Sequence, residues 1–390
     1  MVKKIISIFF TFFLCISNVL AIPIKITSDK YILYNLNDDR ILEEKLSHDE
    51  TQIASLTKIM TTIVAIENID DFDKKVTIKK EMLNGLTRDI AQMGFKVGEQ
   101  YTYNDLLYST MLPSAADAAN ALAVSIGGSI KEFLVLMNNK ARELNLQNTH
   151  YSNSFGLTDK DNYSSAYDIS LLLKYALQNE KFKSIFTAKE YKLTNNKVVK
   201  STVYKFKSPY IIGSKTGYTS KAGRCLASIA NVNDVDLMLV TLNNYNKNLN
   251  YITETNDVYK YYEDNYSYKN VIDENDIITK IGTIDSKEKE YDVKVDKEYT
   301  YYLSNDFNKE DLIYEYEGTT HVSSLDRKNK KIGVVKVKYN DEIIKEIDLF
   351  YDGSLNISNQ ALHLYLSYVS IAIMFICLLV YTKHIKRKGI

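Results

Sequence analysis

Two residues near the start of the chain, Ser55 and Lys58, have types and spacing that could perform nucleophilic chemistry. They lie in residues 54–66, where apolar side chains recur at helical spacing. Residues three apart on a helix share a face, so the hydroxyl and the amine are expected to be neighbours. A neighbouring base activates a serine, and apolar surroundings disfavour the charged form of a lysine. The pair therefore predicts a serine nucleophile with a lysine base. The alternative is a helix cap beside a solvated lysine.

Two further motifs could complete such a site. Ser114 stands at the junction between a loop and an Ala-rich helix, where its ordinary role would be an N-cap. Lys215, Thr216, Gly217 and Tyr218 precede a buried strand. A cation and a hydroxyl there can engage a substrate carboxylate, and the glycine allows a substrate backbone to approach closely; the alternative is an ordinary turn beside an edge strand. Ser-x-x-Lys, Ser and Lys-Thr-Gly in this order form the motif set of penicillin-binding proteins and class A β-lactamases.

The elements that must position these motifs mix helical and strand patterns. A β-hairpin is predicted within residues 24–45, and a short strand at 76–78. Further helices are predicted at residues 104–109, 114–124, 129–144, 166–178 and 255–266, and strands within 189–212 and at 225–230 and 237–242. From about residue 271 to 352 only short alternating strands recur, which predicts a small all-β domain.

The chain resembles the serine-type D-alanyl-D-alanine carboxypeptidases, which are low-molecular-mass penicillin-binding proteins. The resemblance extends over roughly residues 24–264. It is carried by residues 53–61, 137–141, 148–153, 155–157, 165–168, 215–219 and 222–223. The resemblance implies an α/β (α+β) penicillin-binding or β-lactamase-like domain, in which an antiparallel sheet is flanked by a helical cluster. The all-β segment and a C-terminal membrane helix fit the usual layout of this family.

The same resemblance implies an acyl-enzyme route. Ser55 would attack the carbonyl between the two terminal D-alanines of a peptidoglycan stem peptide, with Lys58 as general base. Ser114 would pass the proton toward the leaving amine, and Lys215 would tune it. Water would then release the shortened peptide.

Substrate binding and inhibition also follow from the resemblance. The backbone N–H groups of Ser55 and Tyr218 would form the oxyanion hole, and Thr216 would hold the terminal carboxylate. β-Lactam antibiotics would be covalent inhibitors. No cofactor and no metal are expected.

One position departs from the family pattern. The second motif of the family normally reads Ser-x-Asn, but Ala116 occupies the Asn position here. Asn120 follows one helical turn later and could take over part of the role; the alternative is a solvated or capping amide. The sequence predicts reduced but present activity. A non-hydrolytic penicillin or peptidoglycan binder is the competing hypothesis.

Other functional classes find less support. Lys+Arg 49 against Asp+Glu 49 leaves no basic surplus for nucleic acid. A class A β-lactamase would need a deacylating glutamate some 35 residues after the second motif, by resemblance to that class, and residues 147–151 contain no acid. A zinc peptidase would need clustered ligands. The histidines are scattered at His48, His150, His321, His363 and His384.

The two ends predict export and anchoring. Lys3 and Lys4 precede an apolar run and a cleavable Ala21, which is typical of a secretory signal; the alternative is an uncleaved anchor. Residues 361–381 are long and apolar enough to span a bilayer, and the following basic residues favour a cytoplasmic tail; the alternative is a helix lying on the membrane surface. The predicted segments are a signal peptide at 1–21, a catalytic domain at 22–266, an all-β domain at 267–355, a spanning helix at 361–381 and a tail at 382–390.

Overall fold

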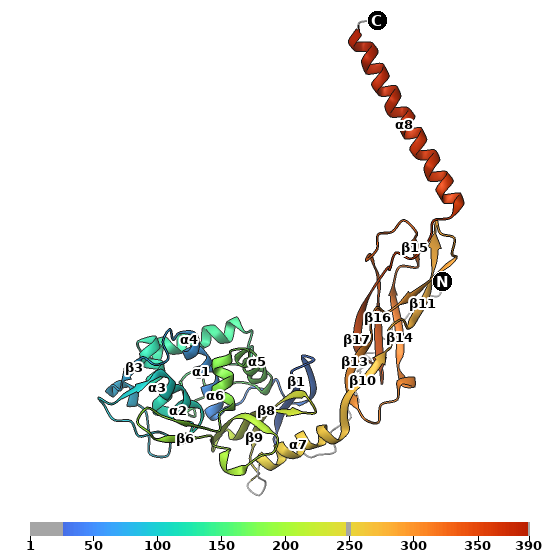
Figure 1. Cartoon of the computed structure of the whole chain (residues 1–390). Helices are drawn as coiled ribbons and strands as arrows, with labels where there is room; N and C mark the ends of the chain where they lie inside the picture. Colours follow the sequence, from blue (N-terminus) through green and yellow to red (C-terminus); the bar gives the residue numbers. More distant parts are fainter. Residues whose placement is uncertain (1–25, 247–250, 389–390) are drawn as a thin grey trace, which may run out of the picture. The chain divides into compact units, whose positions relative to one another are not determined.

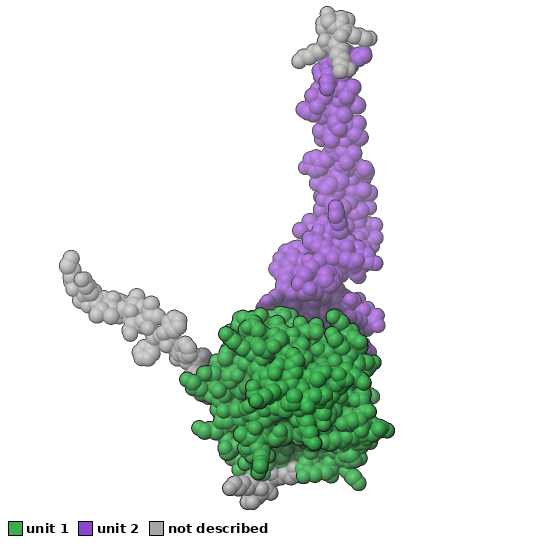
Figure 2. Space-filling model, turned by 90° about the vertical axis from the view of Figure 1, so that its left-hand side faces the viewer, with its two compact units in different colours: residues 1–264 green, residues 265–390 purple. Residues whose placement is uncertain are grey.

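The computed structural model describes residues 26–246 and 251–388 (Figure 1). The expected signal peptide lies outside the described residues. The chain divides into two compact units, Met1–Asp264 and Asn265–Ile390 (Figure 2).

The first unit is built on a five-stranded antiparallel sheet with the strand order β2-β1-β9-β8-β7. Its strands are β1 (Lys30–Asn35), β2 (Arg40–Lys45), β7 (Ile211–Thr219), β8 (Gly223–Val232) and β9 (Val235–Asn244). The predicted hairpin and the two buried strands are confirmed. β8 and β9 are almost wholly buried because helices cover both faces of the sheet. β7 is an edge strand, so its outer backbone groups are free of sheet pairing.

Helices on one face of the sheet enclose a central helix, α1 (Thr57–Glu67). Every residue of α1 except the last is buried, because five other helices contact it. These are α2 (Tyr103–Met111), α3 (Ala116–Gly127), α4 (Ile130–Glu143), α5 (Ala166–Leu177) and α6 (Glu180–Thr187). Four of the five begin at a Thr, Ser or Asn side chain that accepts a backbone N–H of the first turn. The centre of the cluster is therefore rigidly held.

The opposite face of the sheet carries α7 (Tyr251–Asn265), which lies beside β8 and β9 in Figure 1. The Tyr259 hydroxyl is 2.9 Å from Ser228 Oγ of β8, which ties the helix to the sheet. The prediction began this helix at residue 255, four residues after its first residue. The prediction also missed α6, whose eight residues are too short for a clear period.

Short elements connect this framework. The 3-10 helix η1 (Ala54–Leu56) leads directly into α1, and the others lie in the loops over the helical cluster. These are η2 (Lys80–Leu83), η3 (Tyr204–Phe206), and the two-stranded pairs β3 (Lys75–Thr77) with β4 (Gln100–Thr102) and β5 (Glu190–Lys192) with β6 (Val198–Lys200).

The second unit is all-β apart from a 3-10 turn, η4 (Lys309–Asp311), and its last helix. Its strands are β10 (Tyr266–Ile272), β11 (Ile277–Ile284), β12 (Glu290–Lys294), β13 (Tyr299–Ser304), β14 (Ile313–Gly318), β15 (His321–Ser323), β16 (Lys331–Tyr339) and β17 (Glu342–Phe350). They enclose a separate core that includes Val293, Val335 and Tyr351. The chain ends in α8 (Asn359–Lys388), whose segment Asn359–His384 is long and apolar enough to cross a membrane and is not buried against protein.

Candidate active site

Ser55 and Lys58 lie side by side where η1 passes into α1. Lys58 Nζ is 3.0 Å from Ser55 Oγ, and it donates a second hydrogen bond of 2.7 Å to the carbonyl oxygen of Phe155. The Lys58 side chain is almost wholly buried, because α1 runs through the middle of the helical cluster. The hydroxyl and the amine are thus held in contact by the most enclosed helix of the unit.

Burial controls the ionisation of this lysine. It lowers the pKa of Lys58 well below the ordinary lysine value, and the nearby charge of Lys215 lowers the pKa further. The Asp117 carboxylate acts in the opposite direction but more weakly. Burial therefore favours the neutral form of the amine, the form that can accept a proton from the hydroxyl that it contacts.

Ser114 faces the Lys-Thr-Gly motif across the site. Lys215 Nζ donates to Ser114 Oγ at 2.9 Å and to the carbonyl oxygen of Thr216 at 2.8 Å. Ser114 has a φ of +65°, an uncommon conformation for a residue with a β-carbon, and it directs the side chain toward Lys215. The N-cap interpretation is wrong, because the N-cap of α3 is Ala115 and no side chain caps the helix. Burial lowers the pKa of Lys215 to about 7.

A buried carboxylate in the first turn of α3 holds the loop that precedes β4. Asp117 accepts backbone N–H groups from Met93 at 2.9 Å, Gly94 at 2.8 Å and Phe95 at 3.2 Å. These bonds place the segment around residue 94 beside the first turn of α3. They also satisfy a charge that would be costly to bury alone. Asp117 therefore has a structural role next to Ser114.

Two glycines let backbone segments approach Ser55 closely. A β-carbon at Gly217 would lie 3.0 Å from both the Ile53 carbonyl oxygen and the Ser55 nitrogen. A β-carbon at Gly156, where φ is +87°, would lie 1.9 Å from the Ala54 carbonyl oxygen. At Gly217 the protein's own backbone makes such a close approach, and the approach of a substrate there stays a prediction. β7 and the loop containing Gly156 are thereby fixed against the backbone around Ser55.

The remaining residues of the motif differ in exposure: Thr216 is buried, and Tyr218 lies at the exposed end of β7. The hydroxyls of Thr216 and Thr202 are 2.7 Å apart. Tyr218 is 67% exposed, and the Arg224 guanidinium lies 5.8 Å from the centre of its ring. The sequence analysis missed Thr202 because no motif surrounds it. It also missed the role of the Phe155 carbonyl, since backbone groups carry no sequence signal.

Ala116 is an apolar residue with apolar neighbours. Ala116 is fully buried and clusters with Ala119 and Phe155, against which Leu86 and Ile90 pack. No amide therefore reaches the site from this position.

Asn120 makes other contacts. Its Oδ1 accepts the Ser154 hydroxyl at 2.7 Å, and its Nδ2 donates to the Asn84 carbonyl oxygen at 3.3 Å. The solvated or capping interpretation is wrong, because the side chain is 1% exposed. Its bonds hold the loop that carries Phe155, so it supports Lys58 indirectly.

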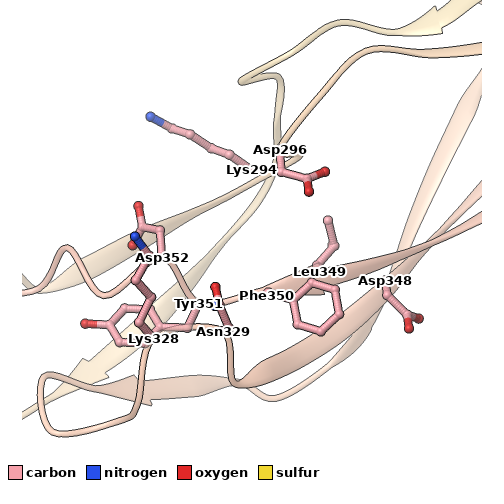
Figure 3. Close-up of a pocket in the computed structure, with 9 residues that line it drawn as sticks. All are labelled: Lys294, Asp296, Lys328, Asn329, Asp348, Leu349, Phe350, Tyr351 and Asp352. Carbon is pink, nitrogen blue, oxygen red and sulfur yellow. The ribbon is translucent and has the colours of Figure 1, made fainter.

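The second unit contains a surface pocket of about 400 Å³ (Figure 3). Lys294 and Lys328 stand around it with three aspartates, and the floor is made by Leu349 and Tyr351. Its lining residues include no serine, cysteine or histidine.

The sequence matches proteins of known activity. The sequence model of the peptidase S11 family, described as D-alanyl-D-alanine carboxypeptidase, matches residues 17–246. The D-alanyl-D-alanine carboxypeptidase DacF of Bacillus subtilis is 27% identical over 330 residues, which cover 81% of this chain and 82% of DacF. The D-alanyl-D-alanine carboxypeptidase DacD of Escherichia coli is 31% identical over 212 residues, 52% of this chain and 54% of DacD.

Solved structures share the fold. The D-alanyl-D-alanine carboxypeptidase DacD from Francisella tularensis has a TM-score of 0.70 at 19% identity, and covers 86% of this chain and 95% of its own. Penicillin binding protein 5 from Haemophilus influenzae has a TM-score of 0.66 at 22% identity, and covers 86% of this chain and 99% of its own. The predicted fold class is confirmed. With the serine and lysine side chains in contact beside the Lys-Thr-Gly strand, the chain belongs to the D-alanyl-D-alanine carboxypeptidase family and is a serine-type carboxypeptidase.

Proposed function

We propose that Ser55 is the nucleophile and Lys58 the general base that release the terminal D-alanine from peptidoglycan stem peptides. The observation that carries this proposal is the 3.0 Å contact between Lys58 Nζ and Ser55 Oγ, made by a lysine whose pKa burial lowers well below the ordinary value. The neutral amine takes the hydroxyl proton as Oγ bonds to the carbonyl carbon between the two D-alanines. The C–N bond then breaks, the leaving amine receives a proton, and water hydrolyses the acyl-enzyme.

Ser114 and Lys215 are proposed to complete the proton path. The Ser114 hydroxyl is 2.9 Å from Lys215 Nζ and can pass a proton toward the leaving amine. A Lys215 pKa of about 7 lets this lysine exchange that proton near neutral pH.

The backbone N–H groups of Ser55 and Tyr218 are proposed as the oxyanion hole. Their proximity is supported by Gly217, which packs within van der Waals distance of the Ser55 nitrogen and directly precedes Tyr218. The hydroxyls of Thr216 and Thr202 form a donor pair next to them, which suits the terminal carboxylate of the substrate.

The alanine at position 116 is compatible with turnover. The Phe155 carbonyl already holds Lys58 at 2.7 Å, so the amine stays oriented without an amide from position 116. Nothing in the described residues favours a binder that has lost hydrolysis.

α8 is proposed as a single-pass membrane anchor. Its apolar side chains are exposed from Leu362 to Tyr381. Exposing this apolar surface to water is unfavourable, whereas the acyl chains of a bilayer would cover it. Lys383 and His384 end the apolar stretch and favour a cytoplasmic tail from residue 382. The catalytic and all-β units would then face the cell wall, where both stem peptides and β-lactam antibiotics are met.

Mass spectrometry of the full chain after incubation with a labelled penicillin tests the nucleophile. We expect one acyl adduct on the peptide containing Ser55, and no adduct in Ser55→Ala. Ser184→Ala, which removes an exposed hydroxyl of α6, should label like the wild type. An adduct that persists in a folded Ser55→Ala variant would overturn the assignment. Measuring D-alanine release from a stem pentapeptide in the same samples separates hydrolysis from binding.

A further inference from the structure

The segment that leads into α8 is bonded to the turn between β11 and β12. The Lys287 N–H donates to the Asn356 carbonyl oxygen at 2.9 Å, and the Ser358 N–H donates to the Asp285 carbonyl oxygen at 2.8 Å. Inside the helix, the Tyr365 hydroxyl donates to the Asp285 carboxylate at 2.7 Å. The first two turns of α8 are therefore attached to the all-β unit and do not follow a free linker.

The length of α8 sets the depth of this attachment in a bilayer. A hydrocarbon core of about 30 Å takes about 20 helical residues. Counted back from Lys383, the first charged residue after the apolar stretch, the core reaches His363. Tyr365 then lies at the outer boundary, where tyrosines are enriched. Its partner Asp285 must lie at the same level, which places the adjoining loops in the headgroup region.

Apolar side chains are exposed at this end of the unit. Ile284 is 51% exposed and Leu325 is 53% exposed. Ser324, which precedes Leu325, donates its N–H to the Ile284 carbonyl oxygen at 3.1 Å and its hydroxyl to the Asp285 carbonyl oxygen at 2.9 Å. Ile284 therefore directly precedes Asp285, the partner of Tyr365, and Leu325 follows a serine that is bonded to Asp285.

Several basic side chains around Ile284 and Leu325 are not in ion pairs with any described residue. Lys287, Lys289, Arg327 and Lys328 have no ion-pair partner among the described residues. Of the acids in the same segments, Asp326 forms an ion pair with Lys330 at 2.7 Å, whereas Asp285 and Glu288 accept hydrogen bonds from the neutral Tyr365 and Asn356. The surface thus carries four cations without an ion-pair partner in the described part of the chain, among two carboxylates, around two exposed apolar side chains.

We propose that this membrane-proximal surface, formed by residues 284–289 and 324–328, rests on the bilayer and binds anionic phospholipid headgroups. Ile284 and Leu325 insert at the boundary of the acyl chains, and the four cations meet lipid phosphates. This docking rests on the proposed membrane anchor. It would fix the all-β unit at the membrane, where a free linker would let it move away.

Fluorescence depth measurements on the full chain in vesicles test the proposal. Single cysteines that carry an environment-sensitive dye are introduced at Leu325→Cys, Ile373→Cys and Ile343→Cys in a Cys15→Ser, Cys377→Ser background. Cys225 is buried and stays unlabelled. Ile343 is a matched control because it is 48% exposed but lies at the end of β17 that is far from the membrane-proximal surface. At about 3.3 Å per residue, the strand separates the two by a distance on the order of 30 Å.

We expect the dye at position 325 to shift to the blue and to be quenched by lipids with a nitroxide on the headgroup, while the dye at 343 is unaffected. The dye at 373 reports the anchor, since a spanning helix exposes it to nitroxides deep in the acyl chains. Quenching at 373 without quenching at 325 would overturn the docking alone. Absence of quenching at both positions would overturn the anchor as well.

A charge variant tests the identity of the lipid group. Vesicles of phosphatidylcholine are compared with vesicles that also contain phosphatidylglycerol. We expect the blue shift at position 325 to increase with the anionic lipid, and the increase to vanish when Lys287, Lys289, Arg327 and Lys328 are all changed to Gln. An equal shift in both kinds of vesicle would contradict the role of the cations.

Discussion

Gly156 lies against the backbone of Ala54, so close that a β-carbon on the glycine would be 1.9 Å from the Ala54 carbonyl oxygen. Ala54 itself has a φ of +46°, and Ser55, the proposed nucleophile, follows it. The neighbouring Phe155 carbonyl holds Lys58. A single close packing of two backbones therefore positions both the nucleophile and the acceptor that orients its base.

Gly156→Ala should disturb both groups at once. The new β-carbon displaces η1 or the loop, and a shift of about 1 Å at a reacting group can cost about 100-fold in rate. Penicillin acylation and D-alanine release should therefore fall together, by about that factor. Gly98→Ala is the matched control, because its φ is +91° but nothing lies within 4 Å of its β-carbon position. Equal losses in the two variants would show that backbone strain, and not the contact with Ala54, is responsible.

Lys58→Arg should remove the base and replace it with a permanent cation. A guanidinium stays protonated at all physiological pH values, so it cannot accept the Ser55 proton. We expect the acylation rate to fall by about 10²–10⁴, the usual contribution of a general base. Stopped-flow acylation with a chromogenic cephalosporin measures this rate, with Lys131→Arg on the exposed face of α4 as control. Wild-type acylation by the arginine variant would exclude Lys58 as the base.

Lys215 should make stability depend on pH. Its pKa is about 7 in the folded protein, against an ordinary value of 10.5. Between these values the unfolded chain binds the proton and the folded protein does not, so stability rises with pH in this window and is lowest below pH 7. One lysine that is protonated only in the unfolded chain raises the free energy of unfolding by at most about 1.4 kcal/mol per pH unit.

Lys215→Met should weaken this dependence. The free energy of unfolding of the first unit, measured by chemical denaturation at pH 7 and pH 9, should rise less in the variant than in the wild type. Lys131→Met, at an exposed position, should keep the wild-type slope. The proposed burial of a neutral amine would be refuted by identical slopes in wild type and Lys215→Met.

Asn120→Ala should act on the site through the loop at residues 153–157. It leaves the buried Ser154 hydroxyl without its 2.7 Å partner, which should cost about 1–3 kcal/mol of stability. The loop carries the Phe155 carbonyl, so the acylation rate should also fall. Asn120→Asp keeps the acceptor oxygen and should restore more of the rate than of the stability. Asn139→Ala, on the exposed face of α4, serves as control. Loss of stability with an unchanged acylation rate would remove the link to Lys58.

The sequence alone determined the chemistry and most of the framework. Ser55 and Lys58 are one helical turn apart, so local geometry is enough to make them neighbours. The hairpin, the buried strands and the helices around α1 follow from periods that a single segment carries. The Lys-Thr-Gly motif was recognisable by its residue types alone. Local patterns failed for the short helix α6 and for the first turn of α7.

Tertiary structure alone decided how these parts meet. That Lys215 bonds to Ser114, that the Phe155 carbonyl holds Lys58, and that Gly217 packs against η1 are contacts between residues about 100 or more positions apart. Ser114 shows the difference: its sequence context is typical of a helix cap, but the fold rotates its hydroxyl toward a lysine of the edge strand. Burial, which sets the pKa of both lysines, is likewise produced only when all the helices have closed around α1.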